Sequence, residues 1–84
     1  MTWILVWTRP ALRDMKKLDQ RLARRIREGV LSLAETGDGD VVKLKGANPP
    51  EWRLREGERR IFFQFQGDAR EIRILRVRRR DRAY

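Results

Sequence analysis

The chain has 84 residues, a length typical of one small domain with a compact core. It has no cysteine and no histidine, which excludes disulfide bonds, the usual thiolate and imidazole zinc sites, and the side chain that most often moves protons at neutral pH. Lysine and arginine number 21 against 12 aspartate and glutamate, a formal net charge of +9, so polyanions are the first partners to consider. A general preference for arginine on the surface, or an acidic protein partner, would explain the same charge.

The sequence favours a cytoplasmic protein without a cofactor or a bound metal. No apolar run approaches the roughly 20 residues that a membrane-spanning helix needs. The apolar N-terminal segment WILVW is short and lacks the basic flank of a signal peptide. The absence of cysteine fits a reducing compartment.

The N-terminal part of the chain predicts a strand and a first helix. The apolar run at residues 3–7 is typical of a strand that is covered on both faces, so we expect it in the centre of a sheet. Thr8 then offers a helix N-cap and Pro10 suits a first helical turn. The helix that follows has apolar residues at helical spacing, Leu12, Met15 and Leu18.

A second helix is predicted between Asp19, a good N-cap, and Gly37, a common helix-ending residue. Gly29 lies inside it and costs a helix about 1 kcal/mol relative to alanine, which indicates close packing against another backbone. The apolar stripe of this helix consists of Leu22, Ile26, Val30 and Leu33.

The second half of the chain predicts four strands. Residues 36–40 and 47–51 have loop compositions and flank a short strand at residues 41–46. Three further strands are predicted at residues 52–55, 59–66 and 71–78, the last two joined by a turn at Gly67 and Asp68. Strands joined by short turns pair antiparallel, with the two helices on one face. We therefore expect one α+β domain over residues 1–84, with the order β-α-α-β-β-β-β, a mainly antiparallel sheet and a loosely held tail at residues 79–84.

Three arginines are predicted on one face of the hairpin around the segment WRLREGERR. Successive side chains of a strand point to opposite faces, so Arg53 and Arg55 point away from Trp52 and Leu54. Arg60 likewise points away from the apolar side of the next strand. Guanidinium groups gathered in this way repel one another unless an anion lies among them, and a phosphodiester is the obvious candidate. The alternative is a solvated strand pair that two acidic residues partly neutralise, Glu56 and Glu58.

Two aromatic residues near these arginines could stack on the bases of single-stranded RNA, Phe62 on the same face and Tyr84 at the C-terminus. For Phe62 a place in the core is the stronger interpretation, because the sheet could be covered on both faces there. The run RVRRRDR at residues 76–82 adds five arginines, and such runs are typical of flexible electrostatic arms.

Four segments together resemble the RelE/ParE superfamily of toxins from type II toxin–antitoxin systems: ALRDMKKLD, KLKG, WRLREGERRIFF and RVRRRDRAY. The resemblance covers nearly the whole chain. It implies a fold similar to small microbial ribonucleases, and a cognate antitoxin, acidic or amphipathic, that wraps the toxin and holds it inactive. RelE-like members, the branch we favour, enter the ribosomal A site and cleave mRNA, whereas ParE-like members poison DNA gyrase.

The same resemblance implies a set of site residues. Basic positions of the RelE site correspond to Arg53 and Arg55, the arginine that opens the following strand to Arg60, the tail arginine to Arg80, and the near-terminal tyrosine to Tyr84. In this assignment Arg60 and Arg80 clamp the phosphate, Arg53 and Arg55 bind the backbone and the transition-state charge, and Tyr84 orients a base. Further contacts to the substrate are expected from Lys43, Lys45, Arg78, Arg79 and Arg82.

The chain departs from the family pattern at Arg79, where many relatives have histidine or lysine, and at Arg78, where glycine is frequent. The implied reaction is attack of a ribose 2′-hydroxyl on the adjacent phosphorus, for which positioning and electrostatics can supply much of the rate. Arginine keeps its proton, so no proton-transferring base is evident. Nearby carboxylates, at Glu51, Glu56, Glu58 and Asp81, are better explained as surface charge. A gyrase poison and an inactive, antitoxin-binding relative therefore remain alternatives.

Overall fold

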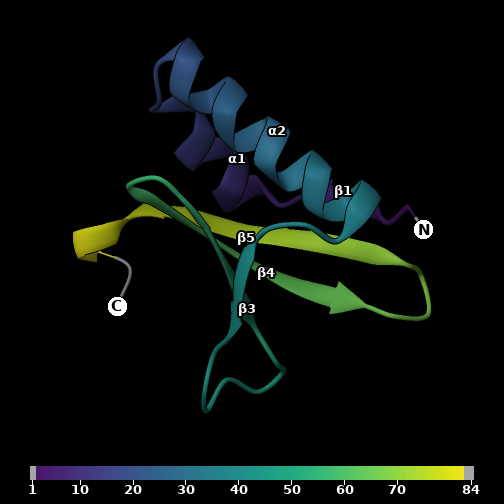
Figure 1. The fold of residues 1–84 in the computed structure, drawn as a ribbon. Coiled ribbons are helices and arrows are strands. Elements are labelled where there is room, and N and C mark those ends of the chain that lie inside the picture. Colours follow the sequence, from purple (N-terminus) through teal and green to yellow (C-terminus); the bar gives the residue numbers. More distant parts are fainter. Residues whose placement is uncertain (1, 83–84) are drawn as a thin grey trace.

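Two helices cover one face of a five-stranded sheet in the computed structural model, which describes residues 2–82 (Figure 1). The elements follow one another as β1 (Ile4–Trp7), α1 (Arg9–Lys16), α2 (Gln20–Thr36), β2 (Asp40–Lys43), β3 (Trp52–Glu56), β4 (Arg59–Gln66), β5 (Glu71–Arg79) and a short 3₁₀ helix, η1 (Arg80–Arg82). The predicted α+β class and element order are confirmed. No helix within these residues is long and apolar enough to cross a membrane.

The strand order in the sheet is β1-β5-β4-β3-β2. The three pairs formed by β2 to β5 are antiparallel, as predicted, whereas β1 pairs in parallel with β5. The predicted central position of the first strand is wrong, because β1 lies at an edge and Ile4 is 60% exposed. Its apolar run packs against the core through Trp3, Leu5 and Trp7, and the main-chain N–H of Trp3 donates to Ala34 of α2 at 2.9 Å. Burial against the helices therefore explains the apolar run without a second neighbouring strand.

Local capping interactions explain where the helices begin and end. The Thr8 hydroxyl oxygen accepts the N–H of Ala11 at 3.4 Å and donates to the carbonyl of Ile74 at 2.7 Å, so the cap of α1 also joins this helix to β5. Asp19 accepts the N–H of Leu22 at 2.8 Å at the start of α2. Gly37 ends α2 with φ at 80°, in the left-handed region that glycine favours. The predicted caps are thus confirmed.

The core lies between the helices and the sheet. Helix α2 buries most of its predicted stripe, with Leu22 partly buried at its edge, and α1 buries Ala11 and Met15 against β5. Leu12, predicted on the apolar side of α1, is instead 46% exposed, because the packed side of this short helix is centred on Ala11. The sheet contributes Leu54, Ile61, Phe63, Ile72, Ile74 and Val77.

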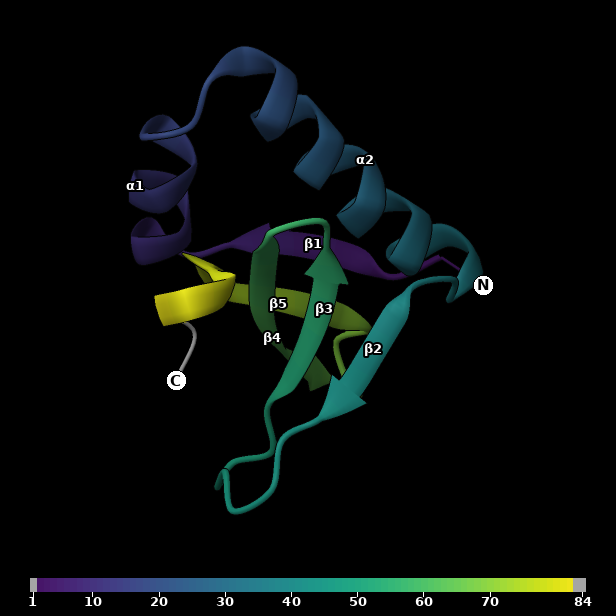
Figure 2. The ribbon, with the colours of Figure 1, turned by 60° about the vertical axis from the view of Figure 1, so that its left-hand side comes forward.

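Three local predictions need correction. The neighbour of Gly29 is a side chain and not a backbone, since a Cβ built there would lie 2.5 Å from the Glu56 carboxylate. Strand β2 ends at Lys43, and the loop that follows extends away from the helices (Figure 2). The described part of the tail is also held in place, because the N–H of Arg80 donates to the carbonyl of Glu58 at 2.8 Å.

Candidate nucleic-acid interface

The sheet face that the helices leave uncovered carries two rows of residues across β3, β4 and β5. In the first row, Arg55 lies opposite Arg60, and Arg60 lies opposite Arg78. In the second row, Arg53 lies opposite Phe62, and Phe62 lies opposite Arg76. The structure therefore brings together Arg53, Arg55 and Arg60, as strand alternation predicts. We call this surface the open face and define it by Arg53, Arg55, Arg60, Phe62, Arg76 and Arg78.

Arg76 and Arg78 share the open face because the ladder between β4 and β5 contains an irregularity. Phe62 pairs with Arg76 but Phe63 pairs with Ile74, so Leu75 is an extra residue on β5. Sequence reasoning missed Arg76 as a site residue. The signal was present in the sequence, because the apolar residues Ile72, Ile74 and Val77 change their spacing at this point.

Arg60 is the most enclosed cation of the open face. Arg60 is only 7% exposed, and its guanidinium donates hydrogen bonds to the carbonyls of Gly57 at 2.9 Å and Arg59 at 3.1 Å. The tight turn that presents these carbonyls requires φ of 59° at Gly57. Within residues 2–82 no carboxylate lies within 4.0 Å of Arg60. The arrangement holds a guanidinium in place through neutral dipoles and leaves its charge uncompensated.

Phe62 is an apolar residue of the open face that arginine side chains cover. It is 1% exposed, and the Arg76 guanidinium lies over its ring at 4.2 Å from the centroid. Arg76 is in turn held by Glu51, whose carboxylate accepts a hydrogen bond at 3.0 Å. Phe62 is therefore buried, in agreement with the preferred interpretation, but arginine side chains cover it in place of a second layer of structure. Base stacking on this ring would require Arg76 to move.

Asp14 of α1 is a second residue that sequence reasoning missed. Its carboxylate accepts the main-chain N–H of Val77 at 2.9 Å and also binds the Arg78 guanidinium. The Asp14 side chain is 14% exposed and that of Arg78 is 41% exposed, so the carboxylate is shielded from water while the guanidinium is partly open to it. Arg78 thus reaches past the edge of β5 towards the helix, and its charge is neutralised within the fold.

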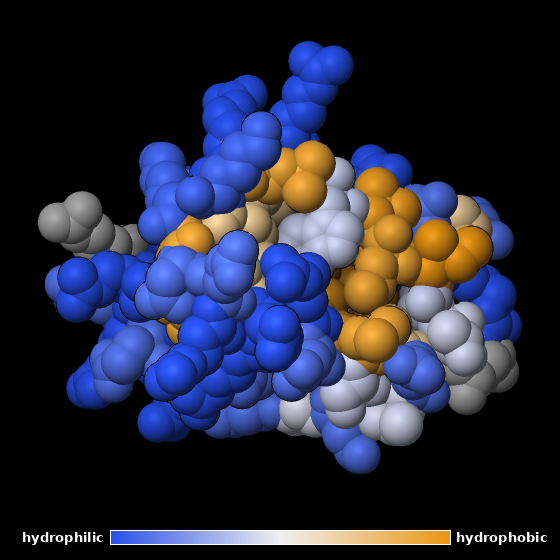
Figure 3. All heavy atoms as spheres, turned by 90° about the horizontal axis from the view of Figure 1, so that it is seen from above, coloured by the Kyte–Doolittle hydropathy of each residue, from blue (hydrophilic) through white to orange (hydrophobic). Residues whose placement is uncertain are grey.

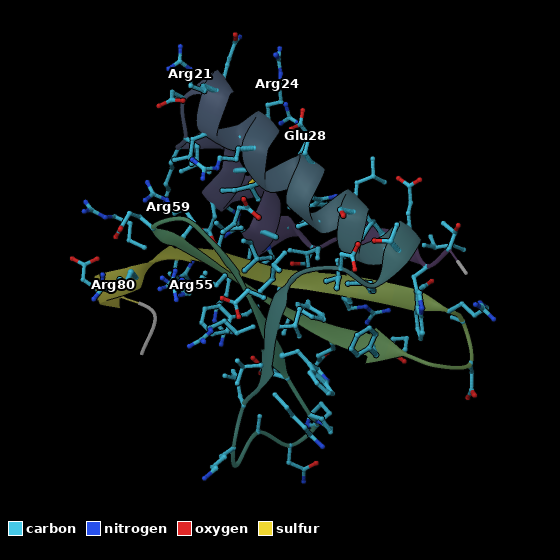
Figure 4. All side chains as sticks on the ribbon, in the orientation of Figure 1. Arg21, Arg24, Glu28, Arg55, Arg59 and Arg80 are labelled. Carbon is cyan, nitrogen blue, oxygen red and sulfur yellow. The ribbon has the colours of Figure 1, made fainter. Side chains whose placement is uncertain are left out.

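The tail begins at the end of β5, where strand pairing defines the side of the sheet on which Arg79 lies. Arg79 lies opposite Arg59 and shares its side with Ile61 and Val77, so it points to the helix side and not to the open face. Figure 4 shows Arg80 at the same end of the sheet as Arg55 and Arg59. The backbone of Arg82 ends η1. Tyr84 lies outside the described residues.

The two lysines named from the sequence lie apart from the open face. Lys43 pairs with Trp52 between β2 and β3, and its ammonium is 5.7 Å from the Trp52 ring, which places it on the side away from Arg53. Lys45 is exposed in the loop after β2. The exposed carboxylate of Asp40 is 4.0 Å from Arg55, a distance at which surface ion pairs contribute little.

The carboxylates near the site are engaged in ion pairs or exposed. Glu56 lies 3.5 Å from Arg25 of α2, and Asp81 lies 3.7 Å from Arg79. Glu58 is exposed at the turn. Residues 2–82 contain no group of three or more acidic side chains arranged to hold a metal ion. What the open face offers chemically is a fixed array of guanidinium donors for an anion.

Comparisons with known proteins agree with this fold. The family model for the ParE toxin of type II toxin–antitoxin systems matches residues 5–84. The archaeal RelE–RelB complex from Pyrococcus horikoshii OT3 contains a chain that is 25% identical, with a TM-score of 0.80 over 99% of this chain and 100% of that chain. The RelBE2 toxin–antitoxin complex from Mycobacterium tuberculosis gives 23% identity and a TM-score of 0.77 over 95% of this chain and 100% of that chain.

The isolated RelE toxin of Escherichia coli is similar as well, with 17% identity and a TM-score of 0.74 over 98% of this chain and 88% of that chain. At such identities the last two structures show the fold alone. No curated protein sequence gives a significant match. The family match extends over almost the full length, and it includes both the hairpin and the arginine-rich tail. The chain therefore belongs to the ParE toxin family of type II toxin–antitoxin systems, within the RelE/ParE superfamily.

Proposed function

We propose that this toxin is a ribosome-dependent mRNA endoribonuclease, an mRNA interferase that inhibits translation and arrests growth. The observation that carries the proposal is the row of Arg55, Arg60 and Arg78 on the open face, with Arg60 buried and its charge uncompensated. A phosphodiester would supply the anion that Arg60 lacks, because its oxygens accept paired hydrogen bonds from guanidinium groups.

The proposed roles follow from how firmly each arginine is held. The Arg60 guanidinium is already oriented by two carbonyls, so it can stabilise the charge of the phosphorane without reorganising. Arg53 and Arg55 flank it on β3 and would hold the RNA backbone. Arg80, at the same end of the sheet, would complete the phosphate clamp (Figure 4). Tyr84 would orient a base.

The reaction we propose is attack of the ribose 2′-oxygen on the adjacent phosphorus. The bond from phosphorus to the 5′-oxygen breaks, leaving a 2′,3′-cyclic phosphate and a free 5′-hydroxyl. The chain has no histidine to move the proton, and Glu51, an acidic residue beside the open face, is bound to Arg76. Catalysis would therefore rest on charge and alignment, with any general base coming from outside this chain.

A cognate antitoxin is the proposed protein partner, because solved relatives are RelE–RelB complexes. Seen from the helix side, apolar side chains form a band beside a crowded hydrophilic region (Figure 3). Leu12 on α1 and Leu31 on α2 are 46% and 49% exposed. Basic residues of α1 lie near Leu12 in the sequence, Arg9, Arg13 and Lys16, whereas Leu31 has both Arg27 and Glu28 beside it on α2. Such a surface suits an acidic, amphipathic segment that folds as it binds.

The test is cleavage of mRNA on programmed ribosomes by the purified toxin, with 5′-end mapping of the products. We expect cuts in phase with codons and little cleavage of naked RNA. Replacing Arg60 by alanine or deleting Tyr84 should abolish cleavage, whereas the exposed helix residue Arg24 should tolerate alanine. Normal cleavage by both site variants would overturn the site assignment, and absence of cleavage by the wild type would overturn the activity.

The second candidate is a poison of DNA gyrase, favoured by the match to the ParE toxin model over residues 5–84. In that case the basic surfaces would contact the enzyme or its DNA. Purified toxin would then inhibit supercoiling by gyrase while translation in a cell extract continued. Expression that arrests growth with intact messages and altered DNA topology would support this candidate over the ribonuclease.

A further inference from the structure

The end of the ladder between β4 and β5 carries two successive pairs of facing arginines. Arg60 lies opposite Arg78 on the open face, and Arg59 lies opposite Arg79 on the helix side. Like charges directly opposite one another destabilise a sheet. In the first pair Asp14 neutralises Arg78, so the repulsion between the two arginines is reduced, while two carbonyls orient Arg60 without neutralising it. The second pair needs a separate explanation.

Arg59 and Arg79 line a solvent-open pocket of about 400 Å³ beside the end of α1. Its walls combine an apolar part, from Leu18 and Val77, with four cationic side chains and a single carboxylate. The charged members are Asp14, Lys17, Arg59, Arg78 and Arg79. The volume lies within the range of pockets that hold small ligands or parts of larger ones.

Three of the four cations of this pocket, Lys17, Arg59 and Arg79, have no strong ion pair within residues 2–82. Asp14 is already engaged by Arg78 and the N–H of Val77. Arg79 has Asp81 at 3.7 Å, but these side chains are 63% and 67% exposed, and such a pair contributes little. Within residues 2–82 neither Lys17 nor Arg59 has a carboxylate within 4.0 Å. Three cations thus surround a space that an anion would fill.

We propose that this pocket is a second phosphate subsite, which binds a backbone phosphate of single-stranded RNA on the helix side of the sheet. We call it the helix-side pocket. The proposal rests on the proposed function for its choice of RNA as the source of the phosphate. The two charged oxygens of a backbone phosphate have enough lone pairs to accept hydrogen bonds from two guanidinium groups and an ammonium, and an RNA strand can place one phosphate here and another on the open face. The opening to solvent lets a chain continue beyond the bound phosphate.

The helix-side pocket is connected to the open face through neighbouring residues. Arg59 precedes Arg60 on β4, and successive side chains of a strand point to opposite faces. An RNA strand held at both places would therefore pass around the end of the β4–β5 ladder, next to the tail that begins at Arg80. The second contact would add affinity and set the path of the strand without touching the scissile bond.

The experiment measures binding of the isolated full-length chain to a short 2′-O-methyl RNA, which cannot be cleaved through its 2′-oxygen. Fluorescence anisotropy gives the association constant at several salt concentrations. Neutralising both pocket arginines, Arg59→Gln with Arg79→Gln, should reduce the slope of log K against log salt by about 0.7, since one phosphate contact on a single strand contributes about 0.7. The matched control neutralises Arg21 and Arg24 on the outer side of α2, which point away from the sheet (Figure 4).

An unchanged slope in the pocket variant, or an equal change in the control, would overturn the proposal. Thermal unfolding of each variant shows whether it is folded, and the single variant Arg59→Gln, expected to reduce the slope by no more than the double variant does, provides a second measurement. Polyglutamate tests whether the pocket binds the carboxylates of an acidic protein. If polyglutamate binds the wild type more tightly than the pocket variant, while both proteins give the same salt slope with RNA, the pocket binds acidic protein and not RNA. Because the binding measurement requires no cleavage, failure of the helix-side pocket to bind RNA is distinguishable from absence of the ribonuclease activity.

Discussion

The carboxylate of Asp14, on α1, accepts the main-chain N–H of Val77, on β5, at 2.9 Å. Strand β1 pairs with β5 only as far as Trp7 and Ile74, so the edge of β5 beyond this point has no strand partner. The side chain of Asp14 replaces that partner for one N–H and binds Arg78 at the same time. Helix α1 is thereby joined to the strand that carries the tail.

Replacing Asp14 by alanine should lower the free energy of unfolding by roughly 1–3 kcal/mol, mainly because the buried N–H of Val77 loses its acceptor, and in part because the partly exposed Arg78 loses its ion pair. Replacing Asp14 by asparagine should lower the free energy of unfolding by less, since the amide oxygen can still accept the main-chain N–H of Val77. Urea unfolding measures both changes, and Asp38→Ala, at an exposed loop position, should stay within about 0.5 kcal/mol of the wild type. An Asp14→Ala variant as stable as Asp38→Ala would contradict the role of this carboxylate.

Gly29 and Glu56 should be coupled in stability. Alanine is favoured over glycine inside a helix by about 1 kcal/mol, but a Cβ at Gly29 would lie 2.5 Å from the Glu56 carboxylate, which pairs with Arg25. Gly29→Ala should therefore stabilise the protein clearly in a Glu56→Ala background and much less in the wild type. Chemical unfolding of the four proteins gives the coupling energy. Equal effects of Gly29→Ala in both backgrounds would show that the carboxylate moves away at no cost.

Arg60→Lys separates charge from geometry in the proposed ribonuclease site. Lysine keeps the charge but cannot donate to two carbonyls and a phosphate through one planar group. We expect cleavage on ribosomes to fall by at least about tenfold, equivalent to about 1.4 kcal/mol of transition-state stabilisation. The same substitution at the exposed Arg24 should leave the rate unchanged. Full activity of Arg60→Lys would mean that only a positive charge is needed there.

Much of the fold was predictable because its signals are local. Thr8, Asp19 and Gly37 cap helices through hydrogen bonds within four residues along the chain, and the turns between strands define the antiparallel pairs. Alternation along β3 and β4 is regular, so the shared face of Arg53, Arg55 and Arg60 follows from the spacing alone.

The remaining features depend on contacts between distant parts of the chain. Asp14 and Val77 are 63 residues apart, and no pattern near Asp14 distinguishes it from an ordinary surface acid on a helix. The parallel pairing of β1 with β5 is equally non-local, and for this reason an apolar run at the sheet edge was predicted in its centre. On β5 the extra residue Leu75 shifts the alternation, which moves Arg76 to the open face and Arg79 to the helix side.

Arg76 should stabilise the protein through two contacts that can be measured separately. Its guanidinium lies 4.2 Å from the Phe62 ring centroid and 3.0 Å from the Glu51 carboxylate, and its side chain is 33% exposed. Arg76→Gln should lower the free energy of unfolding by about 1 kcal/mol, the sum expected for a partly shielded cation–π contact and ion pair. If both contacts contribute, Arg76→Gln should lower the free energy of unfolding by less in a Glu51→Gln background than in the wild type. The decrease should be smaller still when Phe62 is also replaced by leucine. Urea unfolding of these variants gives each coupling energy, and an effect of Arg76→Gln that stays the same in every background would show that neither contact stabilises the fold.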